Sequence, residues 1–173
     1  MNIYLSLLRA LVQARVRFVV IGVGGANYYA QTGGQLFATQ DRDLFLPPDP
    51  GNLLACWQVF YQQGWELGTD VEPLGEPLDL ALAQAVVAHQ GAVKARQGGE
   101  AIDLTLVMQG FRFEEVWRER RTFVSEDVEI PVARLEHIVR SKRAAGRPKD
   151  HLFFATHADD LEDLLQRDEK RGA

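Results

Sequence analysis

The sequence predicts an α/β protein in which a mixed β-sheet is flanked by helices and followed by a helical C-terminal segment. Apolar residues recur at helical spacing near the start, short β-branched or alternating runs follow, and the pattern after residue 132 is helical throughout. A chain of 173 residues is the size of one domain. We therefore expect a single domain, with an α/β core at 1–132 and a helical segment at 133–173 packed on it.

The first part of the chain predicts helices alternating with short strands, because the apolar spacing switches between periods of about 3.6 and 2. In order, the expected elements are a helix at 2–15, a strand at 17–22, a short helix at 26–31, a turn at Gly33-Gly34 and a strand at 41–46. Pro47 and Pro48 stop that strand because proline cannot donate a ladder hydrogen bond. Asn52 is then the expected N-cap of a helix that ends near Gln63.

The rest of the chain predicts two hairpins and a helical end. In order, the expected elements are a strand at 65–68, a helix at 78–89, a hairpin within 92–107, a helix at 113–120, a second hairpin around Phe123 and Ile130, and helices at 134–145 and 149–168. Gly98 and Gly99 favour the first hairpin because glycine accepts the positive φ that tight turns require. Pro148 fits the first turn of the last helix, where its missing N–H has no helical partner to lose.

Composition excludes several classes of protein. The chain has 46% apolar and 25% charged residues, which are ordinary globular values, and its net charge of −5 argues against sequence-blind nucleic-acid binding. The single cysteine, Cys56, lies on the apolar side of a predicted helix, so we expect it in the core and no internal disulfide. The four histidines lack zinc-ligand spacing. With no signal peptide and no apolar run of about 18 residues, we expect a cytoplasmic protein without a membrane span.

The stretch VVIGVGGAN (19–27) predicts a strand, a glycine turn and the start of a helix. Glycines allow a ligand to approach the backbone closely, and a helix N-terminus offers free N–H groups that suit a phosphate. The alternative is a tight turn that binds nothing. The dinucleotide-binding fingerprint would need a third glycine at position 27, where this chain has Asn27.

Asp41 and Asp43 stand one residue apart at the start of the 41–46 strand, so a strand would place both carboxylates on one face. Such a pair is the oxygen-rich arrangement that Mg²⁺ prefers. The alternative is a solvated strand entry. Arg42 between them would face the other way, and we expect it to be exposed, paired or on an edge strand.

Asp103 lies in EAIDLTLV (100–107), where it alternates with apolar residues. An acid in mid-strand is costly to bury unless it is paired or binds a cation. If this strand lies beside the Asp41–Asp43 strand, three carboxylates converge and can hold two Mg²⁺ ions that bridge a nucleoside triphosphate. Asp103 is also a candidate to help deprotonate the attacking hydroxyl.

Lys142 shares the inward face of the helix predicted at 134–145 with the apolar residues Leu135, Ile138 and Val139. An inward lysine could neutralise a triphosphate as a point cation. The alternative is a lysine that extends past the core to solvent. An ion pair of Asp150 with Lys142 or Arg147 would be structural rather than catalytic.

Together these segments resemble the nucleotidyltransferase superfamily, in the small bacterial branch related to AbiEii-type abortive-infection toxins and minimal nucleotidyltransferases. The matching pieces are FVVIGVGGANYYAQ, TQDRDLFL, AIDLTLV, FRFEEVWRERR and IPVARLEHIVRSKRAAGRPKD, which follow the order of the family and cover most of residues 16–152.

The resemblance implies a nucleotidyltransferase-like mixed sheet and transfer of a nucleoside monophosphate from a nucleoside triphosphate to an acceptor hydroxyl. The implied nucleotide-binding residues are Gly24, Gly25, Thr39 and Lys142, and the implied catalytic and metal-binding residues are Asp41, Asp43 and Asp103 with Mg²⁺ or Mn²⁺. The acceptor could be RNA, a protein side chain or a small molecule such as an aminoglycoside. A toxin of a toxin–antitoxin pair, with a cognate antitoxin as partner, belongs to the same expectation.

Two other functions stay open at this point. One is a catalytically inactive protein that keeps this fold and binds a partner protein. The other is a dinucleotide-binding module, because Asp41 and Asp43 lie 19 and 21 residues after Gly22, near the usual offset of about 20 for a ribose-binding acid.

Overall fold

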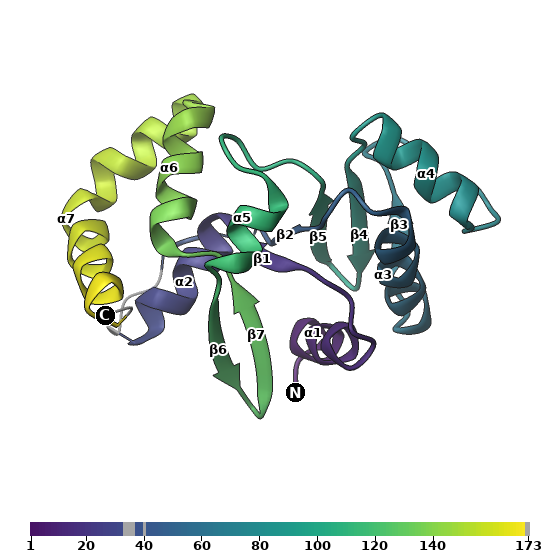
Figure 1. Ribbon diagram of the computed structural model, residues 1–173, viewed down its shortest axis with the longest axis horizontal. Coiled ribbons are helices and arrows are strands. Elements are labelled where there is room, and N and C mark those ends of the chain that lie inside the picture. Colours follow the sequence, from purple (N-terminus) through teal and green to yellow (C-terminus); the bar gives the residue numbers. More distant parts are fainter. Residues whose placement is uncertain (33–36, 40, 172–173) are drawn as a thin grey trace.

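The computed structural model describes residues 1–32, 37–39 and 41–171, and these residues form a mixed sheet with helices around it (Figure 1). In chain order the elements are α1 (Ile3–Gln13), β1 (Val19–Ile21), α2 (Gly22–Thr32), β2 (Asp43–Phe45), α3 (Pro50–Gln62), β3 (Glu66–Gly68), α4 (Leu80–Ala88), β4 (Val93–Gln97), β5 (Glu100–Thr105), α5 (Phe113–Arg118), β6 (Arg121–Ser125), β7 (Val128–Val132), α6 (Leu135–Ala145) and α7 (Pro148–Arg171). The predicted fold class is therefore confirmed.

The sheet of the described residues has the strand order β3-β4-β5-β2-β1-β7-β6. β1 pairs antiparallel with β2 and parallel with β7, whereas β2 pairs parallel with β5. The remaining neighbours are the antiparallel β3–β4, β4–β5 and β6–β7 pairs. A dinucleotide-binding module requires successive parallel strands, so the antiparallel β1–β2 pair argues against that alternative.

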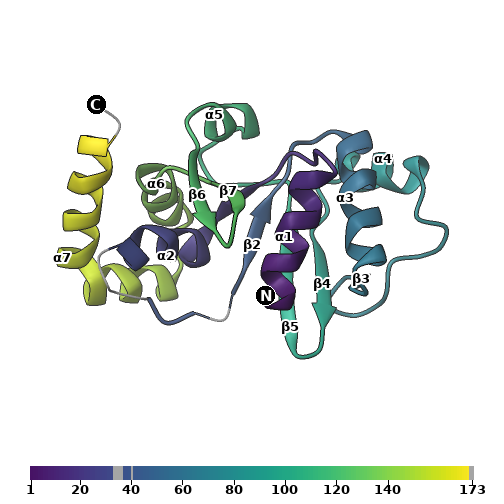
Figure 2. The ribbon, with the colours of Figure 1, turned by 90° about the horizontal axis from the view of Figure 1, so that it is seen from below.

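Different sets of helices lie at the two ends of the sheet. In Figures 1 and 2, α2, α6 and α7 gather at one end of the molecule, and α3 and α4 lie at the other. None of the helices in the described part of the chain has the length and apolarity needed to cross a membrane.

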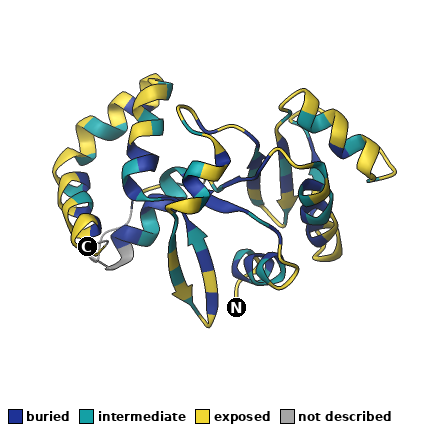
Figure 3. Ribbon diagram, viewed as in Figure 1, coloured by how far each residue is buried: buried dark blue, intermediate teal, exposed yellow. Residues whose placement is uncertain are grey.

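The core lies along the central strands and the helix faces that meet them (Figure 3). Its largest fully buried side chains are Trp57, Phe18, Phe45 and Phe60. Cys56 is buried among them, as expected, and burial raises the pKa of its thiol. A thiol that stays protonated in a closed core is not a nucleophile.

Two predicted details of the first half are corrected or untested. The cap of α3 is Asp49 rather than Asn52, because the Asp49 carboxylate accepts a hydrogen bond from the Gly51 N–H at 2.9 Å. Asn52 lies within the helix, and its side chain instead accepts a hydrogen bond from the Arg17 N–H and donates one to the Arg17 carbonyl. The turn expected at Gly33-Gly34 falls outside the described residues.

The C-terminal third contains two helices separated by a tight break, as the sequence predicts. Gly146 ends α6 with a φ of +59°, which glycine adopts without strain, and Pro148 is the first residue of α7. A non-helical backbone conformation at His157 divides α7 into two parts.

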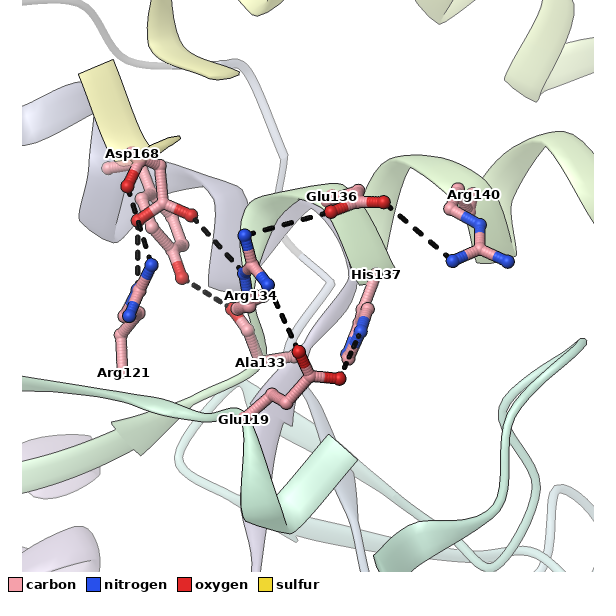
Figure 4. Close-up of polar contacts among 9 residues, drawn as sticks. Glu119, Arg121, Ala133, Arg134, Glu136, His137, Arg140 and Asp168 are labelled. Carbon is pink, nitrogen blue, oxygen red and sulfur yellow. Dashed lines mark hydrogen bonds and ion pairs between the residues drawn. The ribbon is translucent and has the colours of Figure 1, made fainter. Parts of the chain in front are cut away.

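A buried ion-pair network fastens the end of α7 to the sheet and to α6 (Figure 4). Asp168 on α7 is only 3% exposed and lies 3.0 Å from Arg121 Nε and 3.9 Å from Arg134 Nε. Arg134, which precedes α6, also contacts Glu119 at 3.0 Å. We call Arg121, Arg134 and Asp168 the Asp168 clamp. It holds three elements that are far apart in the sequence.

Replacing the buried carboxylate should destabilise the protein, because Asp168→Asn leaves two arginines without their shared counter-charge. We expect a loss of about 2–4 kcal/mol in the free energy of unfolding, measured by urea denaturation. The matched control is Asp163→Asn on the same helix, whose carboxylate pairs with Arg167 at 2.8 Å but is 57% exposed. That change should cost no more than about 0.5 kcal/mol. Equal losses in the two variants would contradict the clamp.

Candidate active site

The centre of the site is a contact between two carboxylates on neighbouring strands. Asp43 on β2 and Asp103 on β5 are register partners in the parallel ladder, and their side chains are close enough to share a hydrogen bond. Register partners in a ladder point to the same face of the sheet. The structure therefore brings Asp43 and Asp103 together, as the sequence predicts.

The contact changes the chemistry of Asp43. Burial first, then the negative charges of Asp103 and Asp41, raise its pKa from 3.8 to about 6, against the opposing positive charge of Lys149. Above about pH 6, Asp43 is a partly buried carboxylate that lies beside the carboxyl group of Asp103. A proton below about pH 6, or a cation above it, relieves their repulsion.

Asp41 is placed differently from the other two acids. It is exposed and lies just before β2, which begins at Asp43, and its N–H donates to Thr39 Oγ1 at 3.0 Å. Its charge reaches Asp43, but no three acidic, histidine or cysteine side chains in the described part of the chain form a group that could hold a metal ion. The structure therefore presents a contacting pair with a third carboxylate nearby, rather than a closed triad.

The glycine turn brings the start of α2 against the acids. Gly22 has a φ of +69°, and a Cβ at this position would lie 2.6 Å from Asp43 Oδ2. A Cβ on Gly24 would lie 3.3 Å from the Asp41 carbonyl oxygen, and one on Gly25 would lie 3.0 Å from Ile138 Cδ1 on α6. The lack of a side chain at Gly24 therefore lets the loop before β2 pack closely against α2, and the lack of one at Gly25 lets α6 do the same. The sequence interpretation missed Gly22, although a glycine directly after a buried strand was the available signal.

A cavity of about 500 Å³ opens beside Asp43. The sheet and the start of α2 contribute Ile21, Gly22 and Asp43, the segment at the end of β5 contributes Thr105, Val107, Met108 and Gln109, and α6 with the following turn contributes Ile138, Ser141, Lys142, Ala144, Ala145 and Arg147. The sequence did not single out half of its polar lining residues, namely Thr105, Gln109 and Ser141, because nothing in their local pattern marks them. The volume and the mixture of apolar and cationic side chains suit a nucleotide.

Lys142 lines this cavity, as expected for an inward lysine, but its ammonium group has a protein partner. Lys142 Nζ lies 2.9 Å from Asp150 Oδ1 and 4.8 Å from the centre of the Phe153 ring. Burial by itself would raise the pKa of Asp150, but hydrogen bonds from Arg147 and Lys142 outweigh it and hold that pKa well below its usual range. Asp150 is 1% exposed and aligns both cations at the cavity wall. The ion pairs of Asp150 with Lys142 and Arg147 that the sequence suggested are present, and a structural role for Asp150 stays a prediction.

The other predicted nucleotide-binding residues lie around a second, smaller cavity. Gly24, Thr39 and Asp41 line a space of about 260 Å³ together with Tyr4, Tyr28 and other residues of α1 and α2. Among the predicted site residues, Asp43 and Lys142 line the larger cavity, whereas Asp103 and Gly25 line neither.

Several arginines have structural partners. Arg42, between the two acids, pairs with Glu100 at 2.7 Å and covers the Tyr4 ring at 4.2 Å, so the expectation that it is paired is confirmed. Arg120 stacks on Trp117, and Arg121 belongs to the Asp168 clamp. These contacts leave Arg42, Arg120 and Arg121 less available to bind RNA.

The sequence matches no protein-family profile and no curated protein. Solved structures nevertheless align with nearly the whole chain. A crystal structure of ANT(2″)-Ia in complex with adenylyl-2″-tobramycin covers 99% of this chain and 98% of its own, with a TM-score of 0.54 and 14% identity. The chain has a nucleotidyltransferase fold. A solution structure of the antibiotic-resistance factor ANT(2″)-Ia agrees, with a TM-score of 0.52, 17% identity and coverage of 98% of this chain and 90% of its own. The predicted fold is confirmed, and the AbiEii-type branch stays a prediction.

The raised pKa of Asp43 predicts that the free energy of unfolding of this protein depends on pH. The folded protein binds this proton more tightly than the unfolded chain, so stability falls as the pH rises from 3.8 to about 6. In EDTA we expect wild type to lose about 2 kcal/mol over this range relative to Asp43→Asn, which has no carboxylate to ionise. Urea denaturation of both proteins at pH 4 and pH 8 measures this. A difference that does not depend on pH would contradict it.

Gly22→Ala should destabilise the turn beside Asp43, because alanine disfavours positive φ and its Cβ would displace the carboxylate. We expect a loss of about 1–3 kcal/mol, measured by thermal melting with van't Hoff analysis. The control is Gly75→Ala, whose Cβ would meet nothing within 4 Å, and which should change stability by less than about 0.5 kcal/mol. Similar effects at both positions would refute the close approach at Gly22.

Proposed function

We propose that this protein is a nucleotidyltransferase that moves a nucleoside monophosphate from a nucleoside triphosphate to an acceptor hydroxyl with the help of a divalent cation. The observation that carries the proposal is the contact between Asp43 and Asp103 at the edge of a nucleotide-sized cavity. Two carboxylates held together at a stability cost are typical of a site that works with a cation. The nucleotidyltransferase fold supports the same reaction class.

The acidic pair fits a divalent cation such as Mg²⁺ or Mn²⁺. Its donors are carboxylate oxygens, and a cation would offset both the burial and the mutual repulsion that raise the pKa of Asp43. Asp43 and Asp103 would hold the ion, with Asp41 as the third carboxylate. When bound, the cation supplies positive charge to phosphate oxygens and makes an attacking hydroxyl easier to deprotonate.

The residues around the larger cavity can bind and orient the triphosphate. The N-terminus of α2 at Gly22 presents backbone N–H groups and the positive end of the helix dipole. Lys142 and Arg147, aligned by Asp150, bring positive charge to the opposite wall. Thr105, Gln109 and Ser141 offer hydrogen-bonding groups to the base or the sugar.

The reaction then needs one proton acceptor. The acceptor oxygen forms a bond to the α-phosphorus, the bond from this phosphorus to the bridging oxygen breaks, and pyrophosphate leaves with the electron pair. Asp103 takes the proton of the acceptor hydroxyl, because its carboxylate lies beside Asp43, which lines the larger cavity.

For the acceptor, we propose a small hydroxylated molecule, with aminoglycosides as the first class to test. The complex of ANT(2″)-Ia contains adenylyl-2″-tobramycin, an adenylylated acceptor of this kind. An RNA acceptor is less favoured because Arg120 and Arg121 have intramolecular partners. A toxin role with a cognate antitoxin rests on the family resemblance alone.

The decisive experiment is incubation of the purified protein with each α-labelled nucleoside triphosphate, Mg²⁺ or Mn²⁺, and a panel of aminoglycosides, total RNA and cell lysate. We expect transfer to at least one acceptor, reduced about 100-fold or more in Asp43→Asn and Asp103→Asn. Asp163→Asn, an exposed acid on α7, is the control that should retain activity.

Two results would overturn the proposal. One is the absence of transfer to any acceptor together with the absence of cation-dependent nucleotide binding. The other is transfer that survives in both acid variants. A protein that binds a partner without transferring label, and does so equally well in the acid variants, would instead be the inactive binding protein considered above.

A further inference from the structure

The acidic pair has a cationic neighbour on the next strand. Lys94 on β4 is the register partner of Asp103 on β5, so the two side chains emerge on the same face of the sheet. Lys94 Nζ lies 3.6 Å from Asp103 Oδ1. The strands β2, β5 and β4 are consecutive in the sheet (Figure 1), and the register places Asp43, Asp103 and Lys94 side by side on them.

The same ammonium group has a second carboxylate within reach. Asp70, which follows β3, lies 3.1 Å from Lys94 Nζ through its Oδ1 atom and is 80% exposed. Arg96 approaches the same Asp70 oxygen at 3.7 Å. Lys94 is therefore shared between an exposed acid on one side and a site acid on the other, and both distances allow a direct ion pair.

A divalent cation and an ammonium group compete for one carboxylate. Each stabilises the negative charge of Asp103, and their like charges repel when both lie within a few ångströms of it. A cation that binds Asp103 must therefore push Lys94 away. Asp70 offers Lys94 a partner within reach, so the ammonium need not become unpaired when it leaves.

We propose that Lys94 bridges Asp103 and Asp70 in the absence of metal, and that it leaves Asp103 and stays on Asp70, the nearer partner, when a divalent cation binds Asp103. The inference rests on the proposed function for the cation. Lys94 is then a positioning residue that sets the affinity of the site for the metal. Without metal, it supplies a positive charge beside the acidic pair.

The exchange makes two opposite predictions for binding of Mn²⁺, measured without nucleotide by the electron paramagnetic resonance signal of the free ion. Lys94→Met removes the competing charge and should tighten Mn²⁺ binding by about 3–10-fold. Asp70→Asn removes the second partner and leaves Lys94 on Asp103, so it should weaken Mn²⁺ binding by about 2–5-fold. Lys170→Met on α7 is the control for a remote loss of the same charge and should change affinity by less than about 2-fold.

A second measurement needs no metal. In EDTA at pH 8, Lys94→Met should lower the melting temperature by about 1–3 °C, because the acidic pair loses its counter-ion. The same change in an Asp103→Asn background should have no such effect. This double-mutant cycle isolates the Lys94–Asp103 interaction from any general effect of the substitution.

The outcomes separate this inference from the proposed function. If wild type binds Mn²⁺ in an Asp43-dependent way but Lys94→Met and Asp70→Asn do not shift affinity in opposite directions, the exchange is wrong and the proposed function stands. If wild type binds no Mn²⁺ and transfers no label, the proposed function and the exchange both fail. In that case the melting cycle alone decides whether Lys94 is the counter-ion of Asp103, and equal Lys94→Met effects in both backgrounds would refute it.

Discussion

The parallel pairing of β2 with β5 places two carboxylates in direct contact, and the rest of the site is arranged around their repulsion. Asp43 and Asp103 cannot move apart because the backbone ladder fixes their register. The turn at Gly22 closes over one carboxylate, and Lys94 stands beside the other. An arrangement that lowers stability in this way is typical of a functional site rather than of a core.

On the α6 side of the cavity, a buried carboxylate holds two cations. Asp150 holds Lys142 and Arg147 in fixed positions on α6 and the following turn, and the Asp168 clamp ties the far end of α7 to the sheet. The two ends of one long helix therefore serve different purposes. Its N-terminal end arranges cations at the cavity, and its C-terminal end fixes α6 and α7 against the core.

The features that the sequence predicted correctly are those that depend on residues close together in the chain. Hairpins, helices and the break at Gly146 follow from apolar periodicity and turn residues, and Asp103 stood out because an acid in an alternating strand needs a partner. Strand order and the antiparallel β1–β2 pair depend on tertiary packing, which periodicity does not contain.

The other differences between the predicted and the observed structure also come from tertiary contacts. Asp49 rather than Asn52 caps α3 because Asn52 is taken by Arg17, which lies 35 positions away in the sequence. Arg121 is partly buried by its ion pair with Asp168, 47 positions away. The sequence placed Asp41 on the strand with Asp43, but β2 starts only at Asp43, so the third acid belongs to the preceding loop. Partners this distant leave no trace in a local pattern.

The β2–β5 ladder also has a consequence for biosynthesis. Its two acids lie 60 positions apart, on strands that emerge from the ribosome at different times. A nascent chain that ends before β5 contains Asp43 but not Asp103. The repulsion between the two carboxylates is therefore absent, and so is the paired site for a cation. Both acids are present once β5 has been made, whereas β6 and β7, which complete the sheet, follow later in the chain.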